Sequence, residues 1–163
     1  MVELIGAWTP WAGLVLFVLV LANQAGVPIP ATPSLLAAGA LAAGGRLSFS
    51  LILATAVAAA LSADLVWYSL GRWRGAQTLA VLRRRVKRAW IDWVESLFLA
   101  HRFGMLLGAR FLPEMNPVGA GLAGASGVGP AHFLLSASGS ALVWAGAWVG
   151  AGYLLTEATA LLR

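Results

Sequence analysis

Two stretches decide the fold of this chain, NQAGVPIPATP at 23–33 and RFLPEMNP at 110–117. Both lie among long apolar segments, yet their prolines remove backbone donors and forbid a regular helix through the stretch. Irregular backbone at membrane depth is tolerated only where protein buries it or where it lines a cavity. We therefore expect each stretch to belong to a hairpin that enters a membrane and returns on the same side.

The composition places the whole chain in lipid. Of its 163 residues, 60% are hydrophobic and 10% are charged, and the mean hydropathy is +0.83. Soluble domains carry roughly 25% charged residues. Cysteine is absent, which excludes disulfides, thiolate metal sites and a cysteine nucleophile. Residues 1–163 are expected to form a single integral membrane domain.

Apolar segments around the two stretches predict three spans, at 8–22, 47–70 and 131–155. A full span takes about 20 residues, so the apolar segment at 34–43, which ends at Gly44-Gly45, is too short to cross. Re-entrant hairpins are expected at 28–45 and 104–129. The first span resembles a signal peptide in length, but its front end has Glu3 and no Lys or Arg, so we expect it to be retained.

The order of a broken hairpin followed by a span occurs twice, in a first half at 11–71 and a second half at 103–155. In each half proline, a polar residue and proline are followed by Ala-Gly, at Ala38-Gly39 and at Ala123-Gly124. Paired, interrupted segments of this kind indicate a transport site between inverted repeats. The alternative is that the interruptions are kinks in ordinary helices.

The segment at 72–102 joins the halves and is strongly basic between Arg72 and Arg88. The positive-inside rule predicts that it is cytoplasmic. We expect a multi-pass protein, and the family resemblance described below implies the plasma (inner) membrane. Apolar side chains three and four residues apart predict an interfacial amphipathic helix over 83–102. Its arginine run either attracts anionic lipid at about 1 kcal/mol per charge or only sets the topology.

Arg110 is the first candidate site residue because it lies between the apolar pairs 106–107 and 111–112. An unpaired charge at that depth costs at least ~2.5 kcal/mol, so the side chain needs a partner. A guanidinium matches a phosphate with two parallel hydrogen bonds, and nearby helix N-termini add amides that favour an anion. The alternatives are that Arg110 reaches the interface or pairs with Glu114.

Two carboxylates are candidate site residues beside Arg110. Asp64, in the second span, is expected to carry a proton or ion, or to pair with Arg110 or Arg72; Glu114 is a second candidate for coupling or charge balance. A central cavity between the hairpins is expected to be lined by Asn23, Gln24, Thr32 and Asn116, with the hairpin breaks at Pro28, Pro30, Pro33, Pro113 and Pro117. The alternative is that these polar residues cap helix ends at the water interface.

Enzyme and metal motifs are absent from the sequence. There is no G-x-S-x-G, P-loop or H-E-x-x-H pattern, and His101 and His132 have no partners at ligand spacing. We expect no enzyme activity, no metal, no cofactor and no nucleic-acid partner.

The chain resembles the DedA family of membrane proteins, which shares its domain with the VTT-type lipid scramblases. The resemblance covers roughly 23–153 and depends on the order and spacing of weak motifs: Gly26-Val27-Pro28-Ile29-Pro30, Ala38-Gly39, Asp64, Tyr68-x-x-Gly71-Arg72-x-x-Gly75, Gly104, Arg110-Phe111-x-Pro113, Ala123-Gly124, Phe133 and Trp144.

The resemblance implies two re-entrant hairpins that face each other and move undecaprenyl phosphate, or a similar anionic lipid, across a bacterial inner membrane, with ion coupling. Arg110 falls on the family's Arg-Phe-x-Pro motif. The chain departs from the pattern near Asn23 and Thr32, where many relatives have acidic residues, and at Asn116, where they have a second arginine. Passive scrambling, an ion-coupled carrier of a small solute, or a docking factor for another membrane protein therefore stay open.

A homo-oligomer is also expected, because many helix faces are Ala- and Gly-rich and allow close approach of backbones.

Overall fold

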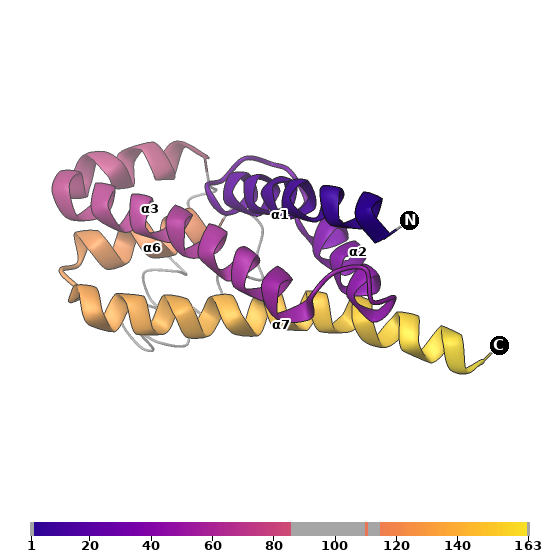
Figure 1. Ribbon diagram of the computed structural model, residues 1–163. Helices are drawn as coiled ribbons and strands as arrows, with labels where there is room; N and C mark the ends of the chain where they lie inside the picture. Colours follow the sequence, from indigo (N-terminus) through magenta and orange to yellow (C-terminus); the bar gives the residue numbers. More distant parts are fainter. Residues whose placement is uncertain (1, 86–109, 111–114, 163) are drawn as a thin grey trace.

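The computed structural model describes residues 2–85, 110 and 115–162, and every regular element in these residues is an α-helix. The helices run along both sides of an elongated molecule, with the two ends of the chain at the same end of it (Figure 1). Their bounds are α1 Val2–Gln24, α2 Thr32–Ala43, α3 Phe49–Arg85, α6 Met115–Ala125 and α7 Pro130–Leu161.

Helix length separates the elements into two kinds. Within the described residues, the segments Phe49–Gly75 and Pro130–Leu161 are long and apolar enough to cross a membrane. With 12 residues in α2 and 11 in α6, the short helices are about 18 Å long or less, against ~30 Å of hydrocarbon. Neither short helix can cross a bilayer by itself.

Two of the prolines that were expected to interrupt helices instead lie in the first turns of the short helices. Pro33 lies in the first turn of α2, and Pro117 lies in the first turn of α6. Proline is tolerated there because a first-turn N–H has no intrahelical acceptor. Pro28 and Pro30 lie in the irregular segment at 25–31, so the first break is shorter than the sequence predicted. Pro113 lies outside the described residues.

The second long helix also departs from its expected end. The sequence predicts an end at Gly71-Arg72, but α3 continues to Arg85 and changes direction at Gly75, where the backbone has φ +29°. Glycine reaches a positive φ more readily than residues that have a Cβ. Apart from Arg83–Arg85, which finish α3, the expected amphipathic helix at 83–102 lies outside the described residues. The same holds for most of 104–114.

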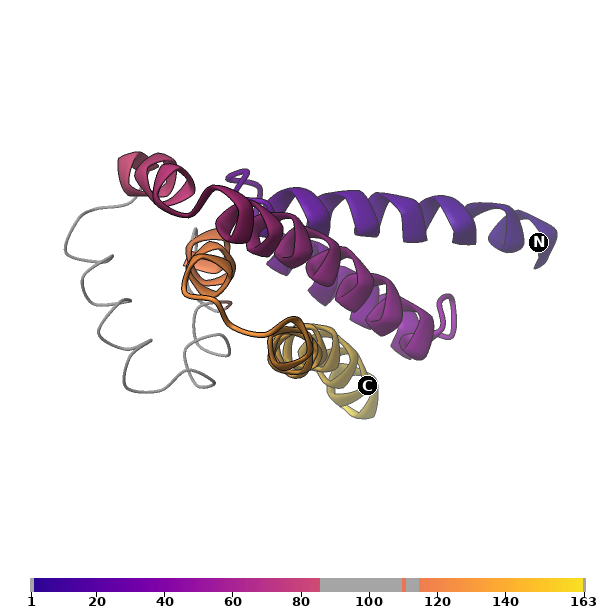
Figure 2. The same cartoon turned by 90° about the vertical axis from the view of Figure 1, so that its left-hand side faces the viewer.

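Each short helix packs on the long helix of the other half of the sequence. α2 packs on α7, and α6 packs on α3. α1 also packs on α3. In Figure 1, α2 and α6 lie towards opposite ends of the long helices, and Figure 2 shows the bundle from its end. The elements therefore form two pairs, α2 with α7 and α6 with α3, and each pair joins the two halves of the sequence.

Glycines make both pairings close. A Cβ on Gly39 would overlap the backbone carbonyl of Val149, and one on Gly152 would overlap that of Leu36. The α3–α6 contact repeats the arrangement: a Cβ on Gly71 would overlap the carbonyl of Gly121, and one on Gly124 would overlap that of Tyr68. Small residues allow helix backbones in lipid to approach and gain dispersion contacts. The same kind of reciprocal glycine contact therefore occurs in both pairs.

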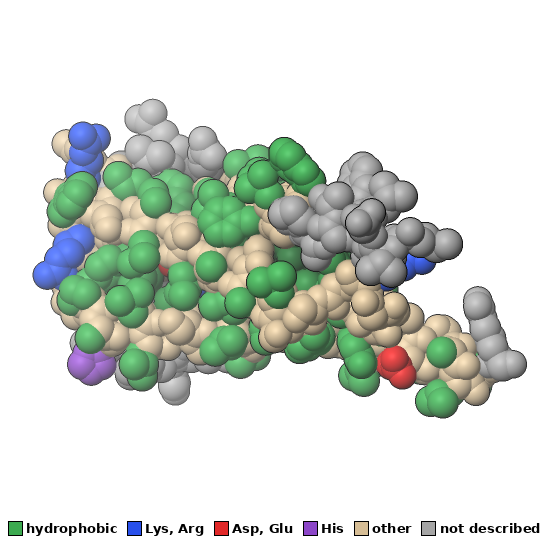
Figure 3. Space-filling view, viewed as in Figure 1, with side chains coloured by type: hydrophobic (Ala, Val, Ile, Leu, Met, Phe, Trp, Pro, Cys, Tyr) green, Lys and Arg blue, Asp and Glu red, His purple; other side chains and the backbone are tan. Residues whose placement is uncertain are grey.

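Apolar side chains cover the outside as well as the core. Those on the surface include Trp11, Val18, Leu51, Val66, Leu135, Val143 and Leu154. Figure 3 shows apolar side chains spread over the visible face, with basic side chains at the end of the molecule where α3 bends and α6 turns into α7, and a further basic group at the opposite end. A surface of this kind fits a lipid environment with a basic end at the headgroups.

Candidate functional site

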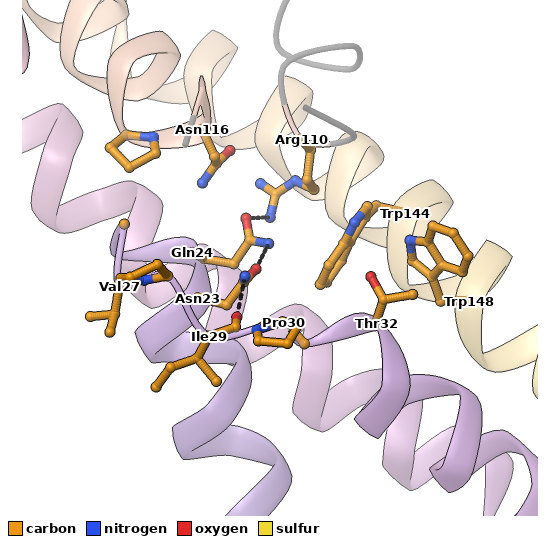
Figure 4. A pocket seen from close by; sticks show the side chains of 14 residues that line it. Asn23, Gln24, Val27, Ile29, Pro30, Thr32, Arg110, Asn116, Trp144 and Trp148 are labelled. Carbon is orange, nitrogen blue, oxygen red and sulfur yellow. Dashed lines mark hydrogen bonds between the residues drawn. The ribbon is translucent and has the colours of Figure 1, made fainter. Parts of the chain in front are cut away.

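A cavity of about 330 Å³ lies where the irregular segment after α1 meets α6 and α7. Figure 4 shows it with polar side chains of α1 on one side and tryptophans of α7 on the other. Its lining consists of Asn23, Gln24, Gly26, Val27, Pro28, Ile29, Pro30, Ala31, Thr32, Arg110, Asn116, Pro117, Trp144 and Trp148.

Both short helices present their N-termini to this cavity. Ala31 and Thr32 from the start of α2 line it, as do Asn116 and Pro117 from the first turn of α6. No side chain caps α2, whose first backbone bond runs from Leu35 N to the Ala31 carbonyl at 3.0 Å. Uncapped first-turn amides and the positive end of the helix dipole favour an anion. The N-terminal turns of α2 and α6 therefore both border the cavity, and α2 is shown to be uncapped.

Arg110 is the cation of the site. Its side chain is 1% exposed, and it donates from Nε to Ser140 Oγ at 3.2 Å and from Nη1 to Gln24 Oε1 at 3.2 Å. Nη2 donates to Asp64 Oδ2 in a buried ion pair. A guanidinium has five N–H groups, so these three bonds to described residues use one hydrogen on each nitrogen, and within the described part of the chain one hydrogen on Nη1 and one on Nη2 have no acceptor. Arg110 can therefore donate to a further acceptor in the cavity.

Asp64 lies behind Arg110, away from the cavity lining. Its side chain is 2% exposed, and its second oxygen, Oδ1, accepts a hydrogen bond from Asn116 Nδ2 at 2.7 Å. This carboxylate consequently links α3, Arg110 and α6. Of the partners considered from the sequence, Asp64 pairs with Arg110, whereas Arg72 donates to Tyr68 Oη and to the Val128 carbonyl.

A chain of amides continues from Arg110 to the first break. Gln24 Nε2 donates to Asn23 Oδ1 at 3.1 Å, and Asn23 Nδ2 donates to the Ile29 carbonyl at 2.6 Å. Figure 4 shows these bonds running along one side of the cavity. Among the described residues, no buried side-chain nitrogen or oxygen lacks a hydrogen-bond partner. Each buried polar atom of this network therefore has at least one partner, which favours one arrangement of these side chains.

Most of the residues expected from the sequence meet at one place. Asn23, Gln24, Thr32 and Asn116 all line the cavity with Arg110, and Asp64 contacts Arg110 from behind. Glu114 lies outside the described residues, so its expected role in coupling stays a prediction.

Three residues on α7 that contact the site were not assigned to it from the sequence, although Trp144 was named among the residues that carry the family resemblance. Ser140 holds Nε of Arg110, and Trp144 and Trp148 line the cavity wall. The tryptophans look like ordinary interfacial anchors in the sequence, because an apolar helix gives no periodic signal for its inner face. The weak signal that was present is Ser140 itself, a hydroxyl in the middle of a span.

The family-motif residues Tyr68, Gly71, Arg72 and Gly75 lie apart from the cavity lining. Tyr68 donates to the Val128 carbonyl at 2.5 Å and stacks on Phe133, with ring centroids 4.2 Å apart. Gly71 gives α6 its close approach, and Gly75 bends α3. These residues fasten the turn between α6 and α7 to α3, which indicates a structural role at this end of the bundle.

The described residues contain no group of three His, Asp or Glu side chains that could hold a metal ion.

Comparison with known proteins agrees with the motifs. The family model of the VTT domain matches residues 29–154. A protein of Synechocystis sp. that is described as an uncharacterized membrane protein is 32% identical over 145 residues, which are 88% of this chain and 66% of that protein. The chain thus covers slightly less than two thirds of this relative. No solved structure matches. The cavity built around Arg110 between two short helices is therefore found in a membrane protein that belongs to the VTT-domain (DedA) family.

Proposed function

We propose that the protein moves a phosphate-bearing lipid between the two leaflets of its membrane by alternating access. A polyprenyl phosphate such as undecaprenyl phosphate is the member of this class that the family resemblance suggests. The observation that carries the proposal is the position of Arg110: a buried guanidinium with spare donors at a cavity that two helix N-termini also border.

The chemistry of the cavity suits a phosphate group. Spare hydrogens on Nη1 and Nη2 of Arg110 lie on the two nitrogens that can bind adjacent phosphate oxygens in parallel. Amides in the first turns of α2 and α6 add further donors. Asn116 connects the first turn of α6 with the Arg110–Asp64 pair, because it lines the cavity and also donates to Asp64.

Alternating access requires two bodies that move against each other around the site. The close glycine contacts favour α2 with α7 as one body and α6 with α3 as the other. Arg110 bonds across this division, to Asp64 on α3 and to Ser140 on α7. A phosphate that competes for the guanidinium would weaken these bonds and so bias the position of the two bodies.

Passive scrambling is a second candidate, favoured by a specific observation. The described residues of the cavity lining include no carboxylate, and Asp64, the buried carboxylate of α3, is held by Arg110 and Asn116. Coupling to protons would therefore have to act through Asp64 or through residues outside the described ones.

The test is movement of a labelled polyprenyl phosphate between the leaflets of proteoliposomes. We expect movement above that of protein-free vesicles, and an imposed pH gradient distinguishes a coupled flippase from a scramblase. Movement no faster than in protein-free vesicles, for this lipid and for common phospholipids, would contradict the proposal. Tight co-purification of another membrane protein would then favour the docking role.

A further inference from the structure

We propose that a groove between α1 and α2 holds one acyl chain of a bilayer phospholipid whose phosphate binds Arg46. This groove is separate from the cavity around Arg110, because the two have no described lining residue in common. The inference goes beyond the proposed function and does not depend on it.

The groove has a volume of about 220 Å³ and lies where α1, α2 and the start of α3 meet. Its helices pack mainly on other partners, α1 on α3 and α2 on α7, and α1 and α2 contact each other only weakly. Leu16 and Ala38, which line it, belong to the buried core, whereas Val15 and Leu51 are each 56% exposed. The groove thus reaches from the core to the lipid-facing surface. Its lining consists of Ala12, Gly13, Val15, Leu16, Leu19, Ser34, Ala37, Ala38, Leu41, Leu47, Ser48, Leu51 and Ile52.

The size of the groove suits a single hydrocarbon chain. Its lining positions lie within 12–19 of α1 and 34–41 of α2, a length of about 12 Å of helix. A second helix is about 10–12 Å wide with its side chains, so the same length of helix would need several times this volume. Water is also disfavoured, since an apolar cavity of about 150 Å³ stays dry and binds apolar molecules instead. An acyl chain is slender and apolar enough to fill the groove.

The groove runs in the direction in which a lipid of one leaflet lies. Leu19 and Ser34 lie toward the ends of α1 and α2 that meet at the cavity around Arg110. Leu41 lies near the other end of α2, toward the end of the molecule that carries both chain termini (Figure 1). A chain that enters from this end points with its tail toward the middle of the molecule, as the acyl chains of that leaflet do.

Arg46 places a cation at the outer end of the groove. Its backbone N–H donates to the Leu41 carbonyl at 3.0 Å, and Leu47 and Ser48, which follow it, line the groove as Leu41 does. The side chain of Arg46 is exposed and has no hydrogen bond or ion pair with another residue that the structure describes. A guanidinium binds a phosphate through two parallel hydrogen bonds. Arg46 is therefore available to a phosphate at the mouth of the groove.

The phosphate contact gives the site its selectivity. Within a bilayer an acyl chain gains no hydrophobic energy by leaving its neighbours, because the lipid tails are as apolar as the groove. The groove therefore orients a chain, and the charge at its outer end decides which lipid stays. A lipid with the same chains but without a phosphate is held less.

The experiment uses the full chain in phosphatidylcholine nanodiscs that contain a trace of phosphatidylglycerol with a photoreactive group in one acyl chain. Peptide mass spectrometry locates the cross-links. We expect cross-links at 12–19 and 34–41 in a yield about fivefold above that of diacylglycerol with the same acyl chains, which corresponds to ~1 kcal/mol for one basic side chain. Equal yields from the two probes would overturn the phosphate contact.

A variant of Arg46 tests the cation. Arg46→Gln should lower the yield from phosphatidylglycerol to that from diacylglycerol. Arg74→Gln is the matched control, because Arg74 is also exposed and lies outside the groove, and it should keep the wild-type yield. A wild-type yield in Arg46→Gln would overturn the assignment of Arg46.

A variant of Gly13 tests the groove itself. A Cβ on Gly13 would have nothing within 4 Å, and leucine favours a helix more than glycine does, so Gly13→Leu should fold and fill the groove. We expect the cross-links at 12–19 and 34–41 to fall by about tenfold or more, since overpacking an occupied site costs at least ~1.4 kcal/mol. Gly146→Leu, which has the same free space on α7 outside the groove, should retain them.

Unchanged cross-links in Gly13→Leu would show that the acyl chain lies elsewhere. Each readout is contact with a lipid and not movement of a lipid between leaflets. Failure of the proposed function and failure of this inference are therefore observed separately.

Discussion

Arg110 and Asp64, 46 residues apart in sequence, form an ion pair in which both side chains are almost completely buried. Asn116 donates to the second oxygen of Asp64, and Ser140 and Gln24 accept from the remaining guanidinium nitrogens. Side chains of α1, α3, α6 and α7 thus converge on one charge pair. Removing either charge leaves the other buried and uncompensated, whereas removing both does not.

Asp64→Ala is therefore expected to lower the free energy of unfolding by about 3–5 kcal/mol, because Arg110 then stays charged in a buried site. The double variant Asp64→Ala with Arg110→Ala should lose clearly less than the sum of the single losses. Thermal unfolding in detergent measures the stability of the two single variants and the double variant relative to the wild type. Additive losses would show that the two charges do not stabilise each other.

Gly152→Ala should destabilise the α2–α7 pair, because the new Cβ would overlap the Leu36 carbonyl. Overpacking of this kind costs about 1–3 kcal/mol. Gly150→Ala is the matched control on the same helix: a Cβ there has nothing within 4 Å, and alanine is the better helix former. The unfolding temperatures of the two variants are compared. Equal temperatures would contradict the close packing of α2 on α7 at Gly152.

Tyr68→Phe removes the hydroxyl that donates to the Val128 carbonyl but keeps the ring on Phe133. We expect a loss of about 1 kcal/mol, the net value of one hydrogen bond. Amide hydrogen exchange should become faster in the turn at 126–129, since its tether to α3 is lost. Unchanged exchange in that turn would argue against the tether.

Gln24→Glu tests the electrostatics of the cavity with almost no change of shape. The new carboxylate would lie where Gln24 Oε1 accepts from Arg110, and it would give the site a net negative charge. We expect lipid movement to fall by about tenfold or more, which corresponds to ~1.4 kcal/mol against the phosphate. Gln24→Met, which removes the amide without adding charge, should reduce movement less; an equal loss in both variants would assign the effect to packing.

Much of this arrangement could be predicted from the sequence. The prolines at 28 and 30 and the glycine pair at 44–45 mark the first short helix, and the cost of a charge in lipid points to Arg110 and Asp64. Pro33 and Pro117 could not be placed from composition, because proline both ends a helix and starts the next one.

The inner faces of the long helices could not be predicted either. In α7 the side chains that face lipid are as apolar as those that face the core, so Ser140, Trp144 and Trp148 do not stand out by periodicity. Only the three-dimensional packing shows which side of α7 meets Arg110.

The most direct test of the central claim compares lipid movement by the wild type with that by Arg110→Lys and by the neutral pair Arg110→Gln with Asp64→Asn. Lysine keeps the charge but loses the planar fork, and the neutral pair keeps hydrogen-bonding groups without an unpaired charge. Arg74→Ala, an exposed arginine outside the cavity, is the control. We expect both Arg110 variants to fold and to lose most movement of a phosphate-bearing lipid, while Arg74→Ala moves it at the wild-type rate. Wild-type movement by the neutral pair would contradict the account, because the phosphate would then be held elsewhere.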